Sequence, residues 1–364
     1  MAHIALDVRF INSGTGTYAV KLLDYLQKLD TENDYSLIVL EKDKDYYRPT
    51  NPRFTVRTVP YLAYTLDEQV GYLRYLNALG ADLVHFCMPQ QPVLYRVKKV
   101  TTIHDLTPLQ TYNSDKNWLI YHFKQFVAGY VFKYIARSST RVIAISNHTK
   151  RDFQAQTHAP DEKIAVIYEA GEAHPGALEP YGGLPFGRFI MYVGQQPDYK
   201  NVRRLGEAHQ QLLESDPELG LVLVGRLNEV TRRNKEYFEQ NGFKNIHFTD
   251  FIPDSKRDWL FTKAIAYVFP SLMEGFGLPP LEAMAYGLPV ISSNASCMPE
   301  VLGDAAIYFD PTDTADMARV ISETINNPVT LKDMQEKGYD QVKKYSWEKM
   351  AKETLEVYRD ALKS

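Results

Sequence analysis

The chain has 364 residues, of which 45% are hydrophobic and 24% charged, and its formal net charge is −4. This length suits two domains of ordinary size rather than a single core, and the balanced charge lacks the strongly basic patch that nucleic-acid binding requires. The two cysteines, Cys87 and Cys297, are too few for a disulfide framework and are typical of a reducing compartment.

The first eight residues, MAHIALDV, resemble a strand and lack the basic flank and apolar core of a signal peptide. A membrane-spanning helix needs about 18 or more consecutive apolar residues. The nearest candidate, residues 118–136, is interrupted by Lys124, Gln125 and Lys133. We therefore expect a cytoplasmic protein without a membrane span.

Short apolar runs alternate with helical patterns along the chain, and each run is a predicted strand. Continuous apolar strands separated by helices are typical of parallel sheets that are covered on both faces. Because one such sheet cannot accommodate them all at this length, the sequence predicts two doubly wound, Rossmann-like α/β domains. The predicted strands are residues 3–8, 35–40, 83–86, 100–104, 141–146, 163–168, 189–194, 219–225, 245–250, 264–269, 289–293 and 305–309.

A stretch rich in Gly and Pro, residues 172–187, interrupts the apolar periodicity and is the expected linker. The first domain then covers residues 1–175 and the second covers residues 185–345. The last segment, residues 346–364, has apolar residues at helical spacing and begins with Ser346, a suitable N-cap. It is predicted to form one amphipathic helix.

The most informative motif is EGFGLPPLE, residues 274–282, which lies between a predicted strand and a predicted helix. Pro280 suits the start of a helix, and parallel α/β sheets bind ligands beyond the carboxyl ends of their strands. The glycine turn therefore offers backbone N–H groups to a phosphate. Glu274 and Glu282 are suited to accept hydrogen bonds from hydroxyl groups, which a sugar nucleotide carries on both sides of its diphosphate. Alternatively, Glu282 is a first-turn residue favoured by the helix dipole and Glu274 a solvated loop residue.

The segment from Ile252 to Pro311, which contains SLMEGFGLPPLEAMAYGLPVISS, resembles the donor-binding half of glycosyltransferase family 4. The members of this family are retaining enzymes with the two-domain GT-B fold. The similarity extends over nearly the whole chain, to TIHDLTPL (102–109), AISNHTKRDF (144–153), YVGQQPDYKN (192–201) and SWEKMAKETLEVY (346–358).

The resemblance implies two Rossmann-like domains that face a cleft, with the last helix crossing back to the first domain. It also implies that Glu274 contacts donor-sugar hydroxyls, that Glu282 contacts the ribose, and that Lys200 binds the diphosphate and stabilises the leaving group. The other implied donor contacts are the amides of Phe276, Gly277 and Leu278, the loop of Gly14, Thr15 and Gly16, and a base site near Phe251 and Ile252.

His104 matches the family histidine beside the transferred sugar, so the implied catalytic residues are His104, Lys200 and Glu274. The implied reaction moves a sugar from GDP-mannose or a UDP-sugar to a glycan or lipid-linked acceptor, which the first domain binds. We expect neither a metal ion nor another cofactor. One departure concerns the diphosphate site, because Gln195 stands where many relatives have an arginine; Arg203 or Arg204 would have to compensate.

Four other functions remain open from the sequence. Residues 14–19 formally fit a dinucleotide fingerprint, with Glu41 after the next strand, but five residues separate the strand from Gly14. Asp43 and Asp45 formally match a metal-binding D-x-D motif, although a solvated charged loop suits them better. A non-catalytic sugar-nucleotide-binding subunit of a partner transferase is the main alternative. Sugar-nucleotide epimerases share the architecture but fit the glycine-rich motif less well.

The segment 116–151 contains no Asp or Glu and mixes cations with aromatic residues, which suits the headgroup boundary of an anionic membrane. We therefore predict peripheral association with the inner face of the membrane; alternatively, the aromatic residues belong to the core. The residues concerned are Lys116, Lys124, Lys133, Arg137, Arg141, Lys150 and Arg151, with Trp118, Tyr121, Phe123, Phe126, Tyr130, Phe132 and Tyr134.

Overall fold

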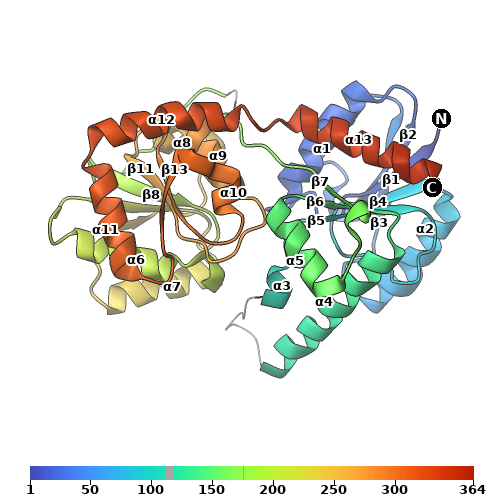
Figure 1. Cartoon of the computed structure of the whole chain (residues 1–364), viewed down its shortest axis with the longest axis horizontal. Coiled ribbons are helices and arrows are strands. Elements are labelled where there is room, and N and C mark those ends of the chain that lie inside the picture. The colour runs from blue at the N-terminus through green and yellow to red at the C-terminus, as the bar shows by residue number, and fades with distance from the viewer. Residues whose placement is uncertain (111–117, 175) are drawn as a thin grey trace. The chain divides into compact units, whose positions relative to one another are not determined.

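The computed structural model describes residues 1–110, 118–174 and 176–364, and these form two compact units (Figure 1). The first unit comprises Met1–Gln110, Trp118–Glu169 and Ser346–Ser364, and the second runs from Ala170 to Tyr345. Side chains are not described at positions 108, 110, 118–121, 123 and 124.

The first unit is built on a seven-stranded parallel sheet with the order β3-β2-β1-β4-β5-β6-β7. Its strands are β1 (His3–Asp7), β2 (Asp34–Leu40), β3 (Phe54–Val59), β4 (Leu83–Phe86), β5 (Lys99–Ile103), β6 (Arg141–Ala144) and β7 (Ile164–Val166). Its helices are α1 (Gly16–Leu29), α2 (Leu73–Leu79), α3 (Thr107–Gln110), α4 (Trp118–Ser138), α5 (Asn147–Thr157) and α13 (Trp347–Lys363), with short 3-10 or π turns at Glu41–Asp43, Glu68–Tyr72 and Asp161–Lys163.

The second unit has a six-stranded parallel sheet with the order β10-β9-β8-β11-β12-β13. Its strands are β8 (Phe189–Val193), β9 (Gly220–Val224), β10 (Ile246–Phe248), β11 (Ala266–Phe269), β12 (Val290–Ser293) and β13 (Ala306–Phe309). Its helices are α6 (Val202–Leu212), α7 (Glu229–Gln240), α8 (Asp254–Phe261), α9 (Leu278–Ala285), α10 (Met298–Leu302), α11 (Thr314–Ile325) and α12 (Pro328–Val342), with 3-10 turns at Asp198–Lys200 and Gly303–Ala305.

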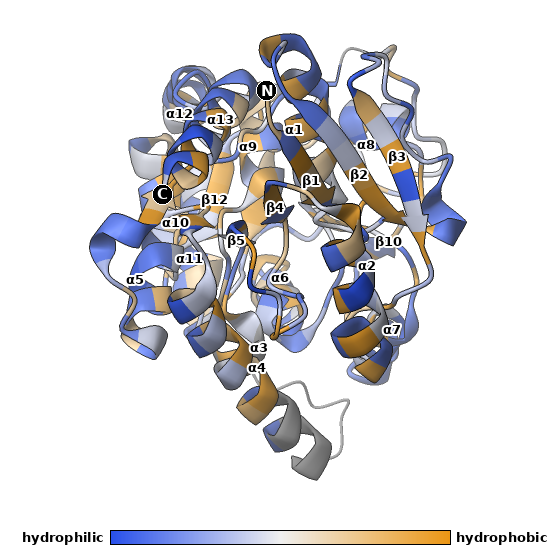
Figure 2. Ribbon diagram, turned by 90° about the vertical axis from the view of Figure 1, so that its right-hand side faces the viewer, coloured by the Kyte–Doolittle hydropathy of each residue, from blue (hydrophilic) through white to orange (hydrophobic). Residues whose placement is uncertain are grey.

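The central strands are buried along their whole length, as β4 (LVHF) and β9 (GLVLV) illustrate. Figure 2 shows hydrophobic strands such as β1, β4 and β12 between helices with hydrophilic outer faces. A strand that is covered on both faces has no solvated side, so its sequence is a continuous apolar run. This explains why the two parallel sheets were predictable, and the predicted α/β class is confirmed.

One strand, β3, is absent from the sequence prediction. It pairs only with β2 at the edge of the first sheet, and its interior residues Thr55, Arg57 and Thr58 are polar. An edge strand that is partly solvated has no continuous apolar run, so it escapes a search for buried strands.

The last helix, α13, completes the first unit. The Ser346 side chain accepts a hydrogen bond from the Lys349 amide at 3.3 Å and caps the helix as predicted. Trp347, Met350 and Tyr358 are buried, and α13 packs against α1 and β5.

The division between the units falls at Glu169 and Ala170, before the expected linker of residues 172–187. Residues after this point pack within the second unit. A Cβ atom on Gly171 would lie 2.4 Å from Leu281 Cβ, and the His174 amide donates to the Tyr286 hydroxyl at 2.9 Å. The start of the Gly- and Pro-rich stretch is thus held against α9.

Candidate active site

The turn between β11 and α9 is shaped by Gly277, which has φ +91°. This left-handed backbone conformation favours glycine, and a Cβ atom there would also displace Met298 Cε, which would lie 2.6 Å away. Pro279 and Pro280 occupy the first turn of α9. Because proline has no N–H group, the amides of the preceding residues, including Gly277 and Leu278, are the donors that this helix start supplies. The expected role of these amides therefore fits the geometry of the turn. The Phe276 ring, by contrast, is buried against Tyr345.

Lys200 and Glu274 meet at the carboxyl ends of β8 and β11. Lys200 Nζ lies 2.5 Å from Glu274 Oε1, and both side chains are largely buried. Burial lowers the pKa of Lys200, but the Glu274 carboxylate, together with Tyr192 and Tyr199, raises it above its usual value. The Glu274 amide also donates to Ser296 Oγ at 3.1 Å. Two predicted site residues are thus brought together and neutralise each other.

Glu282 lies in α9, where its carboxylate makes no hydrogen bond to any described residue although it is half-buried. Burial raises its pKa, and the nearby Arg257 and His174 oppose this rise. Arg257 itself is paired with Asp254 at 2.9 Å and with Asp258 at 2.8 Å. The carboxylate oxygens of Glu282 therefore remain able to accept hydrogen bonds from hydroxyl groups.

Phe251, at the predicted base site, is 64% exposed just beyond β10. The guanidinium of Arg226 lies 4.8 Å from the centre of its ring, while Ile252 is half-buried. Arg226 lies two residues beyond β9 and was missed by the sequence analysis, although its position just after a strand is a signal that could have found it. The exposed Phe251 ring and the Arg226 guanidinium are both planar groups, and they lie beyond the carboxyl ends of β10 and β9, as Lys200 lies beyond the carboxyl end of β8.

The cations expected to compensate for Gln195 are bonded within the second unit. Arg203 Nε donates to Asn234 Oδ1 at 2.8 Å, and Arg204 donates to Asn201 Oδ1 at 3.1 Å. Either arginine would have to give up its bond to the asparagine before it could bind a diphosphate in place of the missing arginine.

In the first unit, His104 follows β5 and is only 6% exposed. Its Nδ1 lies 3.2 Å from Glu169 Oε1 and its Nε2 lies 2.9 Å from the carbonyl oxygen of Cys87. The Tyr18 ring stands edge-on to the imidazole, with 4.8 Å between ring centres. The sequence analysis missed Glu169, although its place directly after the predicted strand 163–168 is a signal that could have found it.

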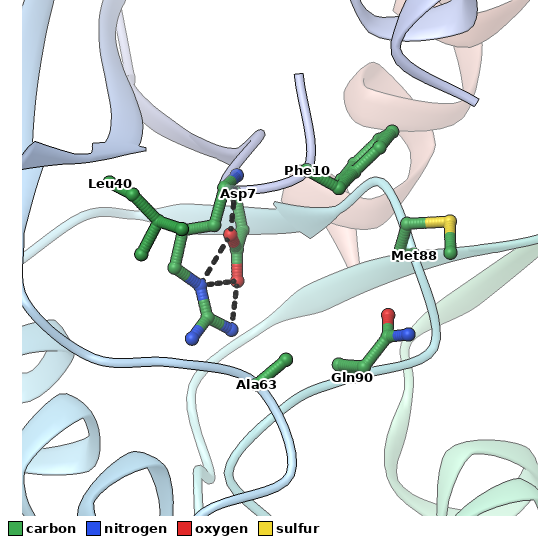
Figure 3. A pocket seen from close by; sticks show the side chains of 7 residues that line it. Asp7, Phe10, Leu40, Ala63, Met88 and Gln90 are labelled. Carbon is green, nitrogen blue, oxygen red and sulfur yellow. Dashed lines mark hydrogen bonds and ion pairs between the residues drawn. The ribbon is translucent and has the colours of Figure 1, made fainter. Parts of the chain in front are cut away.

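His104 lines a pocket together with Thr15, Met88, Gln90 and Asp105. Met88 and Gln90 also line a neighbouring pocket at the ends of β1 and β2, where Figure 3 shows Asp7 and Leu40 on one side and Met88 and Gln90 on the other.

A buried ion-pair cluster forms the wall of that neighbouring pocket. Arg9 is paired with Asp7 at 2.8 Å and with Glu68 at 2.7 Å. The Arg9 guanidinium also lies 4.0 Å from the centre of the Tyr72 ring. Both carboxylates of the cluster thus bind the one guanidinium.

The N-terminal glycines take different positions. Gly14 is exposed, with open space where a Cβ atom would lie, whereas a Cβ on Gly16 would meet the Ile11 carbonyl oxygen at 1.9 Å. Gly16 begins α1 and allows this close approach of the backbone. Thr15, between them, lines the His104 pocket.

Asp43 is buried and accepts a hydrogen bond from Asn12 at 3.0 Å, so it is not the solvated residue that the sequence analysis expected.

The segment 116–151 is divided between core and surface. Lys116 and the side chains of Trp118, Tyr121, Phe123 and Lys124 lie outside the described residues. Phe132 is buried, and the Tyr134 hydroxyl lies 3.0 Å from Lys99 Nζ. By contrast, Phe126 is 75% and Tyr130 59% exposed, and Lys133 and Arg137 are also exposed on α4. In the part of the chain that the structure describes, no helix combines the length and apolarity needed to cross a membrane.

Comparison with known proteins identifies both halves of the chain. The family model described as glycosyl transferases group 1 matches residues 186–341, and the model of glycosyltransferase family 4 matches residues 12–170. O-antigen chain mannosyltransferase B of Escherichia coli is 33% identical over 180 residues, which cover 48% of this chain and 47% of that protein. O-antigen chain mannosyltransferase RfbU of Salmonella typhimurium is 25% identical over 84% of this chain and 86% of its own length. The chain spans only 34% of the length of a serotype-specific mannosyltransferase WbdA of Escherichia coli, to which it is 29% identical.

Solved structures share the fold at low sequence identity. Sucrose-phosphate synthase from Thermosynechococcus elongatus has a TM-score of 0.79 at 18% identity, with coverage of 99% of this chain and 98% of that one. WaaG, a glycosyltransferase involved in lipopolysaccharide biosynthesis, has a TM-score of 0.73 at 16% identity, with coverage of 97% and 99%. The two parallel sheets and the two adjoining family matches lead to one conclusion: the chain belongs to glycosyltransferase family 4 and has the GT-B fold.

Proposed function

We propose that this chain is a retaining hexosyltransferase that needs no metal ion and takes its sugar from GDP-mannose, with a UDP-sugar as the second candidate donor. The observation that carries the proposal is the Lys200–Glu274 pair beside the start of α9. It combines a cation for a diphosphate, a carboxylate for sugar hydroxyls and a helix start that suits an anion. Several similar proteins are named mannosyltransferases, which favours mannose.

In the proposed reaction, the donor exchanges the internal ion pair for bonds of its own. Lys200 moves from Glu274 to the diphosphate and neutralises the charge that develops as the glycosidic bond breaks. Glu274 then accepts hydrogen bonds from the sugar, while Glu282 accepts them from the ribose. Helix amides and Lys200 together fulfil the role that a divalent cation has in other transferases.

Retention of configuration follows from same-face substitution in this proposal. The acceptor hydroxyl attacks the anomeric carbon from the side on which the diphosphate leaves, and the departing phosphate oxygen takes the acceptor's proton. A double displacement would instead require a carboxylate nucleophile beside the anomeric carbon.

The acceptor is proposed to be a glycan or lipid-linked saccharide in polysaccharide or glycoconjugate biosynthesis, bound by the first unit at the cytoplasmic face of a membrane. The exposed residues Phe126, Tyr130, Lys133 and Arg137 share one face of α4, since they are three or four positions apart. Rings that bury and cations that meet lipid phosphates suit an anionic surface. An apolar groove lined by Leu66, Val127 and Tyr130, among others, lies along the same helix.

The donor is tested by thermal denaturation with GDP-mannose, UDP-glucose, UDP-galactose and ADP-glucose, followed by transfer and hydrolysis assays with whichever donor stabilises the protein. A donor at 100 times its Kd should add about 2.7 kcal/mol to the free energy of unfolding. Stabilisation by none of the four contradicts the proposed donor site. Stabilisation without hydrolysis or transfer, in the presence of membrane extracts as a source of acceptor, favours the non-catalytic subunit instead.

A further inference from the structure

The His104 ring is held between two oxygen atoms that accept hydrogen bonds. The carbonyl oxygen of Cys87 lies 2.9 Å from Nε2, and a carboxylate oxygen of Glu169 lies 3.2 Å from Nδ1. A backbone carbonyl cannot donate, and neither can an ionised carboxylate. A neutral imidazole carries only one N–H group. Both contacts are therefore satisfied only when both ring nitrogens carry a proton.

The surroundings of the ring favour that charge. Glu169 is only 4% exposed, so its negative charge is poorly solvated and needs a nearby cation. Asp105, the next residue, adds a second carboxylate and is itself bonded to the Thr107 amide at 2.8 Å. Burial lowers the pKa of His104, but Glu169, the Cys87 carbonyl and Asp105 together raise it above the usual value of 6.5.

The remaining titratable neighbours are neutral. His85 is fully buried between Tyr358, at 2.6 Å, and Thr102, at 2.8 Å. Burial and the charge of His104 together lower the pKa of His85 to about 3. Burial also raises the pKa of the Tyr18 hydroxyl and of the Cys87 thiol well above their usual values. His104 is thus the single cation of this cluster of described residues.

We propose that His104 is a permanent imidazolium, and that Glu169 is a positioning residue that keeps it charged and fixes its orientation. Because both N–H groups point at protein oxygens, the ring cannot take a proton from an acceptor hydroxyl. It instead provides a fixed positive charge on the wall of the pocket that it lines with Thr15 and Gln90. This consequence for catalysis rests on the proposed transferase function, whereas the charge itself does not.

The charge is measured by ¹⁵N NMR of histidine-labelled protein, with the His104 signals assigned from their loss in His104→Gln. At a pH about one unit above the ordinary histidine value of 6.5, both ring nitrogens of His104 should be protonated in the wild type. In Glu169→Gln, which keeps the shape of the side chain, one nitrogen should lose its proton at that pH. Glu162→Gln makes the same chemical change at an exposed position and should leave the signals unaltered. A wild-type His104 with a single protonated nitrogen overturns the proposal, whatever the enzyme does.

The catalytic consequence is measured by the pH profile of kcat for transfer. One pH unit above the ordinary histidine pKa, Glu169→Gln should lose roughly tenfold of its activity, and more at higher pH. At that pH only about a tenth of the molecules with an ordinary histidine pKa carry the protonated ring. The variant should recover towards the wild-type value as the pH is lowered, because acid restores the imidazolium. A loss that is equal at every pH indicates a purely structural role for Glu169. An absence of transfer by the wild type contradicts the proposed function but leaves the NMR result standing.

Discussion

Lys200 and Glu274 are 74 positions apart in the sequence, yet their side chains form an ion pair with 2.5 Å between Nζ and Oε1. Removal of either partner leaves an uncompensated, largely buried charge and removes a donor contact at the same time. Lys200→Met and Glu274→Gln should therefore each lower kcat by about 10²–10³-fold, the usual cost of one preorganised charge-stabilising group. Lys332→Met, which removes an exposed lysine of the same unit, is the matched control. Near wild-type rates in both site variants, measured on folded protein, would remove this pair from the mechanism.

Glu282 should act on binding rather than on the chemical step. Its carboxylate makes no hydrogen bond within the described residues, so Glu282→Gln disturbs little in the free protein. Loss of a hydrogen bond to a charged group costs about 1.5–3 kcal/mol, which is roughly a ten- to hundredfold weaker donor affinity. Calorimetric titration with the donor measures this directly, and Glu336→Gln, an exposed helical glutamate, is the control. Unchanged affinity would contradict the ribose contact.

Lys99 should make the stability of the protein depend on pH. It is fully buried and bonded to the Tyr95 carbonyl at 2.8 Å and to the Tyr134 hydroxyl at 3.0 Å, and no described carboxylate pairs with it. Burial, together with the charges of Arg96 and Lys163, lowers its pKa to about 7.

Because the unfolded chain binds the Lys99 proton up to its usual pKa of 10.5, unfolding takes up a proton between these two values. The free energy of unfolding should therefore rise with pH from about 7 towards 10.5. Urea denaturation across this range should show the rise in the wild type and a flatter curve in Lys99→Met. Identical curves for the two proteins would show that Lys99 stays charged in the folded state.

Association with lipid should depend on the exposed face of α4. Each Lys or Arg near an anionic surface contributes about 1 kcal/mol, so Lys133→Glu/Arg137→Glu should reduce cosedimentation with anionic vesicles by more than tenfold at low salt. Lys332→Glu/Lys343→Glu changes the same charge on exposed residues of α12 and its end and should have little effect. Wild-type protein that stays in solution with anionic vesicles at low salt would favour an acceptor away from the membrane.

Transfer should continue in excess EDTA, because the proposed mechanism neutralises the diphosphate with Lys200 and helix amides. Asp43 is bonded to Asn12 and Asp45 to Arg48, which ties both carboxylates of the D-x-D sequence to other side chains. Activity that disappears with EDTA and returns with Mn²⁺ would instead require a metal ion in the mechanism. The assay needs only the wild-type protein and its donor.

The sequence predicted those features that a local pattern encodes. Strands such as β4 and β9 are continuous apolar runs because both of their faces are covered. The turn at Gly277 is predictable from the glycines and prolines around it. Contacts between distant segments leave no such trace. Glu169 meets His104 only because β5 and β7 end at the same edge of the first sheet. Asp43, likewise, is buried and bonded to Asn12, which is 31 positions away in the sequence.

The helix α13 has a further consequence for how the chain is made. The first unit needs residues 346–364 to cover α1, yet the whole second unit, from Ala170 to Tyr345, lies between these residues and Glu169. On the ribosome, where domains generally fold as they emerge, the second unit has all its strands and helices before α13 has been synthesised. The unit that begins first is therefore completed last, and until then the side of α1 that α13 covers remains open to other proteins in the cell.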